Sequence, residues 1–410
     1  MNLLKKAYCR SFQFCLRTAI PFLPYREPGI LDSIHQLPEV LKKQQIHSVL
    51  LITDQAIRHQ GLTQPLEQLL QRSGIHCVVY DRTVANPTSE NVEQCRELWL
   101  REGCEAIIGF GGGSSMDCAK ATGARIAKPR QPLSKMEGIL RVHHRLPLLI
   151  AIPTTAGTGS EVTVAAVITD SETHHKYAIT DFFLIPALAV HDPELTRTLP
   201  RSLTASTAMD ALTHAVEAYI GKSTTRDSRA NALEAVRLIF GNLDAAFEDG
   251  NNMEARRNLL TAAYLAGNAF SKSYVGYVHA IAHSLSGKYN LPHGFTNAVL
   301  LPWVLEAYGG CIHRQLAQLA IAAGIADSSW NPSIAAAAFI RAIRSMNRRY
   351  GIPSYLEAIR EEDIAELAKT ADHEANPLYP VPLLMGPKQL ECLYKQVMVL
   401  HNGGRMEEIA

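Results

Sequence analysis

Short apolar runs alternate with amphipathic stretches through the first half of the chain. The runs are rich in β-branched residues and have the length of buried strands, and they cover residues 48–54, 76–80, 106–110, 148–152 and 187–190. Helical periodicity over 62–71 and 91–102 separates the first three. Because strand–helix–strand alternation gives right-handed crossovers, the pattern predicts a parallel sheet with helices on both faces.

The pattern changes after Pro200, where strand-like runs give way to helical periodicity. The periodic segments cover residues 202–220, 230–247, 253–270, 315–323, 335–350 and 364–369. The sequence therefore predicts a Rossmann-like, parallel-sheet α/β domain over residues 28–199 and an all-helical domain over residues 200–410. We expect a cleft between the two, since ligands bind at domain interfaces and at the carboxyl ends of parallel strands.

The first 27 residues form an extension before these domains. Residues 1–20 carry four cations and no acid, with apolar residues between the charges. A transit peptide or an interfacial helix has such a composition. The apolar stretch is too short and too interrupted to span a membrane, and no convincing cleavage site follows it. The favoured interpretation is an N-terminal helix that packs on the body of the protein or on a second subunit.

Composition narrows the class of protein. Of 410 residues, 47% are hydrophobic and 19% are charged, which allows a packed interior and excludes disorder. The 40 basic residues nearly balance 39 acidic ones, so that no global field favours nucleic acid. Eight cysteines without a CxxC pair indicate reduced thiols rather than disulfides or a Cys-ligated zinc. These features predict a cytoplasmic enzyme acting on a small molecule, without nucleic-acid or membrane partners.

Two loops rich in small residues follow predicted strands. The first, FGGGSSMD over residues 110–117, stands between a strand and a predicted helix. Its glycines let backbone N–H groups approach an anion, and the helix N-terminus favours phosphate, so this loop is predicted to bind a pyrophosphate. The second, PTTAGTGS over 153–160, offers hydroxyls at Thr154, Thr155 and Thr158 beside two glycines. Such hydroxyls can bind phosphate, ribose or a nicotinamide amide.

An acid and an asparagine stand at two other turns. Asp54 ends a predicted strand, where a carboxylate can accept hydrogen bonds from an adenosine ribose and repel a 2′-phosphate. A helix N-cap explains the same acid equally well. Asn86 belongs to an Asn-Pro-Thr turn, and its composition alone indicates nothing more.

A second group of residues combines one acid with several histidines. Asp210 and His214 are spaced i, i+4 on one predicted helix, as are His279 and His283, and His293 follows in a turn. Buried carboxylates and imidazoles are costly without partners, and a divalent metal would satisfy them. One carboxylate with imidazoles suits Fe²⁺ or Zn²⁺.

These motifs occur in a specific order along the chain. Their order, GGGSSMD, PTTAGTGSEVT, DALTHAVEA and then HAIAH followed by HG, resembles that of the iron-containing (type III) alcohol dehydrogenase family. The resemblance runs from about residue 28 to the C-terminal helices and leaves the N-terminal extension outside. The proline-rich segment 376–382 departs from the family pattern.

The resemblance implies a role for each matching residue. The metal ligands are Asp210, His214, His279 and His293, and His283 is the histidine that faces substrate and nicotinamide. The implied cofactor contacts are Asp54, Asn86, Gly112, Gly113, Ser114, Ser115, Met116, Thr154, Thr155, Thr158, Val167 and Lys176, with Val167 and Lys176 on further strands. The resemblance also implies a homodimer or larger homo-oligomer, and the full ligand set differs from that of glycerol dehydrogenase-like relatives with three protein ligands.

The predicted function is reversible hydride transfer between a small primary alcohol or aldehyde and NAD(H), with Fe²⁺ or alternatively Zn²⁺ as the metal. A dehydroquinate synthase-like or glycerol dehydrogenase-like metalloenzyme shares the fold. The first of these needs cations for a phosphorylated substrate, and residues 270–294 supply only Lys272 and Lys288. A non-enzymatic metal- and nucleotide-binding scaffold is the third reading.

Overall fold

The computed structural model describes residues 1–398, so residues 399–410 of the predicted helical domain lie outside the described residues. The chain divides into two units, each built from segments distant in sequence. The α/β unit contains Pro24–Thr204 and Asn242–Ser271. The helical unit contains Met1–Leu23, Ala205–Gly241 and the chain from Lys272 onward. The single boundary between residues 199 and 200 stays a prediction.

The main sheet of the α/β unit has six parallel strands among the described residues, in the order β1-β9-β6-β4-β2-β3. The strands are β1 (Gly29–Leu31), β2 (Ser48–Ile52), β3 (His76–Tyr80), β4 (Ala106–Gly111), β6 (Leu148–Pro153) and β9 (Leu188–Val190). The predicted parallel sheet is therefore confirmed. Sequence periodicity did not indicate β1, which has only three residues, none of them buried.

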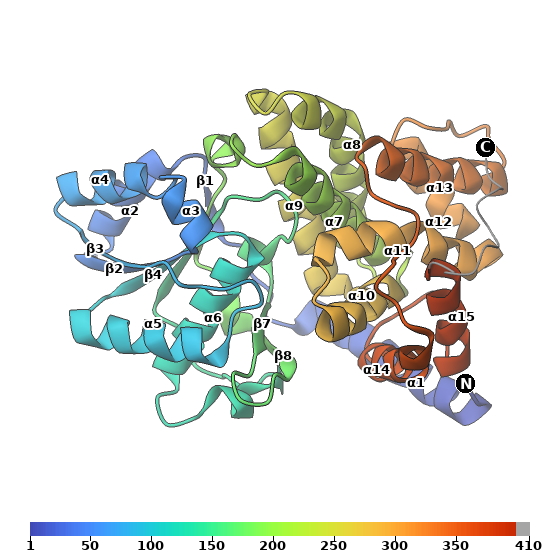
Figure 1. Cartoon of the computed structure of the whole chain (residues 1–410), viewed down its shortest axis with the longest axis horizontal. Coiled ribbons are helices and arrows are strands. Elements are labelled where there is room, and N and C mark those ends of the chain that lie inside the picture. The colour runs from blue at the N-terminus through green and yellow to red at the C-terminus, as the bar shows by residue number, and fades with distance from the viewer. Residues whose placement is uncertain (399–410) are drawn as a thin grey trace. The chain divides into compact units, whose positions relative to one another are not determined.

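Helices cover both faces of this sheet, as Figure 1 shows. They are α2 (Leu37–Lys43), α3 (Gln55–His59), α4 (Gln64–Arg72), α5 (Ser89–Glu102) and α6 (Gly113–Ala127). Successive residues of β2 alternate between two apolar clusters: Leu50 and Ile52 pack with residues of α5 and α6, whereas Val49 and Leu51 pack with residues of α2 and α4. Because both faces are buried, the strand is a continuous apolar run without alternating polar positions.

A smaller sheet completes this unit. It contains β5 (Gly138–Ile139), β7 (Ala165–Thr169) and β8 (Lys176–Thr180) in the order β5-β8-β7, with β7 and β8 antiparallel. The strands that the resemblance implied for Val167 and Lys176 are thus present. Asp117 at the start of α6 accepts the backbone N–H of Val167 at 3.0 Å, which ties the small sheet to the main one.

After Pro200 the described chain contains only α- and 3-10 helices as regular elements, as the periodicity predicts. The α-helices are α7 (Arg201–Ile220), α8 (Arg226–Glu248), α9 (Met253–Ser273), α10 (Tyr277–Tyr289), α11 (His293–Tyr308), α12 (His313–Ala322), α13 (Pro332–Arg349), α14 (Ile364–Ala375) and α15 (Pro387–Val397). No helix of the described chain is both long enough and apolar enough to cross a membrane.

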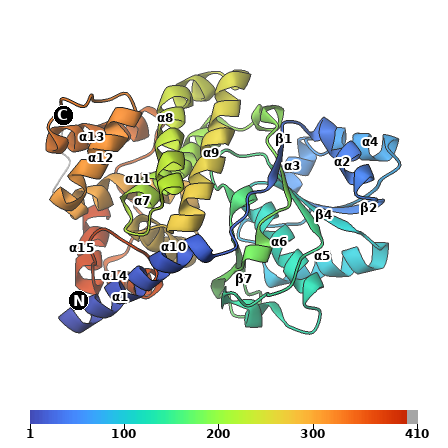
Figure 2. The same cartoon turned by 180° about the vertical axis from the view of Figure 1, so that it is seen from behind.

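The N-terminal extension forms helix α1 (Leu3–Ala19), which packs against the helical unit alongside α14 (Figure 2). Asn2 caps this helix by accepting the backbone N–H of Lys5 at 2.8 Å. Cys9 and Gln13, one turn apart, are the buried residues of α1. The favoured interpretation, a helix packed on the body of the protein, is confirmed. All eight cysteines are free in the structure.

Candidate metal and cofactor sites

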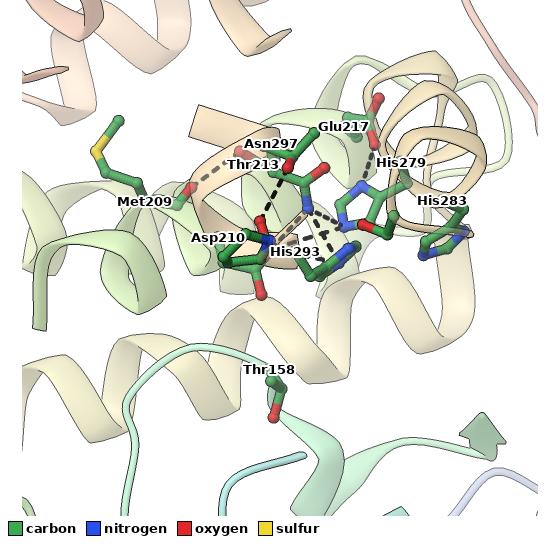
Figure 3. Close-up of polar contacts among 12 residues, drawn as sticks. Thr158, Met209, Asp210, Thr213, Glu217, His279, His283, His293 and Asn297 are labelled. Atoms are coloured by element: carbon green, nitrogen blue, oxygen red, sulfur yellow. Dashed lines mark hydrogen bonds and ion pairs between the residues drawn. The ribbon is translucent and has the colours of Figure 1, made fainter. Parts of the chain in front are cut away.

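Four predicted ligands gather in the helical unit. Asp210 and His214 lie one turn apart on α7, His279 lies on α10, and His293 is the first residue of α11 (Figure 3). One donor atom from each lies within 4.8 Å of the others. Asp210, His214 and His279 are buried, and His293 is partly buried. The helices thus bring together residues that are up to 83 positions apart in sequence.

A carboxylate behind the cluster orients one of these rings. Glu217, one turn after His214, has an oxygen 2.6 Å from Nδ1 of His279 and accepts the backbone N–H groups of Gly276 and Val278, each at 2.8 Å. When Glu217 is ionised its oxygens only accept, so Nδ1 of His279 then carries the proton and the Nε2 lone pair is left for the cluster.

Burial shifts the pKa values of both Glu217 and His279. Burial raises the pKa of Glu217 to about 8, although hydrogen bonds from the backbone of Gly276, Val278 and His279 act to lower it. Burial and the neighbouring His214 and His293 hold the pKa of His279 well below its usual range, so that its imidazole is neutral. A neutral imidazole is the form that binds a metal, and a cation on its Nε2 would favour the ionised carboxylate behind it.

The amide of Asn297, one turn after His293 on α11, lies against the same donor atoms. Its Nδ2 donates to Oδ1 of Asp210 at 2.7 Å and lies 3.2 Å from Nε2 of His279 and 3.1 Å from Nε2 of His293. Since an amide nitrogen only donates, these ring nitrogens present lone pairs toward a common region. A carboxylate oxygen and imidazole lone pairs that converge in a buried site fit a first-row divalent cation.

His283 lies beside this group but outside it. It is one turn after His279 on α10, and its ring stacks on that of His293, with centroids 5.0 Å apart and planes at 18°. Its Nδ1 is 2.6 Å from Oε1 of Glu374 on α14. The structure therefore separates four clustered donors, of which three are histidines, from a fourth histidine that has a carboxylate partner of its own.

The predicted cofactor residues lie in the α/β unit, where three of their segments follow neighbouring strands. Asp54 comes after β2, the glycine loop after β4 and the threonine loop after β6, at one edge of the sheet. Gly112 is the N-cap of α6, and Gly113 is its first residue. A Cβ on Gly113 would lie 3.0 Å from Cγ2 of Thr158, so the two loops are in contact. This edge exposes a helix N-terminus between hydroxyl groups, an arrangement that binds phosphate.

The remaining cofactor residues occupy different surroundings. Asp54 caps α3 by accepting the backbone N–H of Ile57 at 2.9 Å, so the N-cap interpretation holds structurally. Asn86, with a φ of 59°, accepts a hydrogen bond at 2.8 Å from Nζ of Lys176 on β8. Ser115 and Met116 are buried within α6.

Most of the chain matches family models, in two parts. Residues 31–193 match the model described as iron-containing alcohol dehydrogenase, and residues 204–398 match the C-terminal model of the same family. The chain belongs to the iron-containing alcohol dehydrogenase family. Helix α1 precedes both matched regions.

Several members of the family are similar to this chain over most of its length. Alcohol dehydrogenase 4 of Saccharomyces cerevisiae is 36% identical over 87% of this chain and 92% of its own. The NAD-dependent methanol dehydrogenase of Bacillus methanolicus is 36% identical over 81% of this chain and 87% of its own. A crystal structure of 1,3-propanediol oxidoreductase superposes with a TM-score of 0.87 at 35% identity, covering 91% of this chain and 99% of that one.

Some functional contacts in this family member were not anticipated from its sequence. Glu217 and Asn297 line the cluster, and Glu374 contacts His283. Asp117, half-buried, accepts from Oγ of Ser160 at 2.8 Å and so joins α6 to the end of the threonine loop. A sequence signal existed for two of them: Glu217 is spaced i+3 from His214 and Asn297 i+4 from His293, each on the ligand-bearing face of its helix.

Replacing Glu217 with glutamine is expected to weaken metal binding about 10–100-fold, because the amide no longer fixes the His279 ring with a charged acceptor. Competition with a chelator of known affinity measures the change. Glu234→Gln, which removes an exposed carboxylate paired with Arg237 on α8, is the matched control and should leave the affinity unchanged. Equal metal affinity of the Glu217→Gln and control variants would contradict the orienting role.

Proposed function

We propose that this protein catalyses reversible, NAD-linked oxidation of small primary alcohols to aldehydes with the help of a divalent metal. The observation that carries the proposal is the convergence of one carboxylate oxygen and three imidazole nitrogens within 4.8 Å in a family of alcohol dehydrogenases. We propose Asp210, His214, His279 and His293 as the ligands. Fe²⁺ is the first candidate and Zn²⁺ the second, since both accept this donor set.

The metal and the protein have separate parts in this chemistry. A divalent ion held by the four residues would act as a Lewis acid toward an alcohol or aldehyde oxygen. Glu217 fixes the tautomer of His279, and Asn297 donates to Asp210. His283, held at Nδ1 by Glu374, keeps Nε2 free to take up or return the hydroxyl proton. When bound, the nicotinamide would supply the hydride chemistry, and the protein would position the alcohol relative to it.

For the dinucleotide, we propose the edge formed by the ends of β2, β4 and β6. The N-terminus of α6, with Gly112, Gly113 and Ser114, would hold the pyrophosphate, and Thr155 and Thr158 would donate hydroxyls to phosphate or nicotinamide. The remaining proposed contacts are Asn86, Ser115, Met116, Thr154, Val167 and Lys176. Asp54 would accept from the adenosine ribose and disfavour a 2′-phosphate, which makes NAD the proposed cofactor rather than NADP. The NAD-dependent relative supports this choice. The homodimer or larger homo-oligomer and the cytoplasmic location stay predictions.

A deuterium-transfer experiment tests the proposed reaction. The metal-loaded protein is given NAD⁺ with a panel of short primary alcohols, including methanol and 1,3-propanediol, each deuterated at the carbinol carbon. Steady accumulation of NADH that carries one substrate deuterium is expected, because hydride transfer is direct. Bound NAD⁺ without net NADH would instead indicate the transient cofactor use of a dehydroquinate synthase-like enzyme and would refute the proposal.

A further inference from the structure

A chain of contacts leads from His283 to a segment outside regular secondary structure. Oε1 of Glu374, on the last turn of α14, lies 2.6 Å from Nδ1 of His283 and accepts the hydroxyl of Tyr379 at 2.7 Å. Tyr379 belongs to the segment 376–386, which connects α14 to α15. A carboxylate with two donors on one oxygen is held in a fixed rotamer, and it accepts from the imidazole.

Helix α1 holds the backbone on both sides of Tyr379. The side-chain amide of Gln13 donates to the carbonyl oxygens of Pro377 at 3.1 Å and Tyr379 at 2.7 Å. The Arg10 guanidinium donates to the carbonyl oxygens of Val381 at 2.8 Å and Pro382 at 3.0 Å.

Two further contacts hold α14 and segment 376–386 in the helical unit. Lys5 forms an ion pair of 2.6 Å with Asp372, half a turn before Glu374 on α14. A residue outside α1 also contacts segment 376–386: the backbone N–H of Lys222 donates to the carbonyl oxygen of Pro380 at 2.6 Å. All these residues belong to the helical unit.

The burial of Gln13 distinguishes this attachment from a surface contact. Its side chain is 3% exposed, so each of its amide hydrogens must find an acceptor or cost free energy. Both acceptors are carbonyls of the segment that carries Tyr379. Removing Gln13 would leave these carbonyls without the amide and loosen the segment at that residue.

We propose that Glu374 is a positioning residue for His283, and that α1 is an intramolecular brace that keeps Glu374 in place through Tyr379. Glu374 holds the proton on Nδ1 of His283 and so leaves Nε2 as the proton acceptor. This proposal rests on the proposed function for its effect on turnover. The tautomer of His283 is independent of that function.

The first test reads the tautomer directly. Protein labelled with ¹⁵N-histidine is loaded with diamagnetic Zn²⁺, and the His283 ring signals are assigned by their loss in His283→Ala. The Nδ1–H tautomer is expected in the wild-type chain, and a mixture of tautomers in Glu374→Gln. Glu366→Gln, an exposed carboxylate on the same helix, is the matched control and should keep the wild-type signal. An Nε2–H tautomer in the wild type, or a signal unmoved by Glu374→Gln, overturns the positioning role even if no alcohol is oxidised.

The second test is a double-mutant cycle on turnover with metal-loaded protein. Glu374→Gln is expected to lower kcat about 10–100-fold, with KM for alcohol and NAD⁺ and the metal content unchanged. In the His283→Ala background the same change should have no further effect, since the residue acts through that ring. An equal loss in both backgrounds would contradict the proposal.

The brace is tested by Gln13→Ala, which should lower kcat about 3–10-fold in the wild-type background and leave kcat unchanged in Glu374→Gln. The Gln13→Ala protein could instead be less stable than the wild type and yet have the same kcat and the same His283 tautomer. That result would refute the brace but not the role of Glu374.

Discussion

Replacing His279 with alanine is expected to remove the metal and to lower turnover by at least about 1000-fold, since a Lewis-acid metal supplies several kcal/mol of transition-state stabilisation. Among the proposed ligands, His279 has a buried, neutral ring that Glu217 orients. Its loss leaves three donors and a cavity beside the buried His214 and the partly buried His293. Metal content by mass spectrometry and NADH formation, measured on the same preparation, test both parts of the expectation.

Two histidine variants control this result. His283→Ala should keep a full complement of metal and lose about 100-fold or more in kcat, because a positioned proton acceptor contributes that much. His174→Ala removes an exposed ring and should change neither quantity. Loss of the metal in His283→Ala would contradict the division between four ligands and one proton carrier.

Replacing Gly159 with alanine is expected to have the second largest effect, on stability and on NAD⁺ affinity together. Gly159 has a φ of 59°, and an added Cβ would lie 2.7 Å from Cα of Gly267 and 2.8 Å from the carbonyl oxygen of Ala263 on α9. Both contacts are with backbone, so the threonine loop itself must move. We expect a loss of about 2–4 kcal/mol in the free energy of unfolding and at least a tenfold weaker NAD⁺ complex.

Gly74→Ala separates the steric cause from the backbone conformation. Gly74 has a φ of 73°, but nothing lies within 4 Å of an added Cβ. This variant should lose about 1–2 kcal/mol from the positive φ alone and bind NAD⁺ normally. Urea unfolding and calorimetric NAD⁺ titration compare the two variants. If the two variants lose the same free energy of unfolding and bind NAD⁺ with the same affinity, the close approach of residue 159 to α9 does not constrain the threonine loop.

The sequence predicted those strands and helices whose buried residues form apolar runs or recur at a regular spacing. Five strands of the main sheet were predicted from short apolar runs, which are longest in β2, β4 and β6 because both faces of these strands are buried. β1 has three residues that are not buried, and β7 and β8 each bury one face and partly expose the other, so none of the three is a fully buried run. The resemblance to known sequences placed Val167 and Lys176 on strands.

The ends of helices were harder to predict from the sequence where their last turn carries polar side chains. Periodicity predicted the helix now described as α14 only to residue 369, whereas it continues to Ala375. The missing turn holds Asp372 and Glu374, whose carboxylates contact Lys5 and His283. Their partners are distant in sequence, and polar residues of this kind break the apolar pattern that identifies a helix face.

The residues of the candidate site were likewise predictable from the sequence only in part. Helical spacing identified Asp210 with His214 and His279 with His283, because i, i+4 residues share a helix face. Spacing alone did not separate His293 from His283. The family resemblance implied that His293 is a ligand and His283 is not, and the structure places His293 with the first three donors and His283 against Glu374. Local spacing identifies residues of the right type, and their division into ligands and a proton carrier depends on contacts between helices.

The central claim is that one metal ion, held by four residues, supports NAD-linked alcohol oxidation. The most direct measurement is an anaerobic titration of metal-stripped protein with Fe²⁺, and separately with Zn²⁺, in which bound metal and the rate of NADH formation from a short alcohol are followed together. The account predicts that activity rises in proportion to bound metal with at least one of the ions and stops at one ion per chain, and that His279→Ala gains neither. Alcohol oxidation at full rate without bound metal, or a fully loaded protein that forms no NADH from any short alcohol, would contradict it.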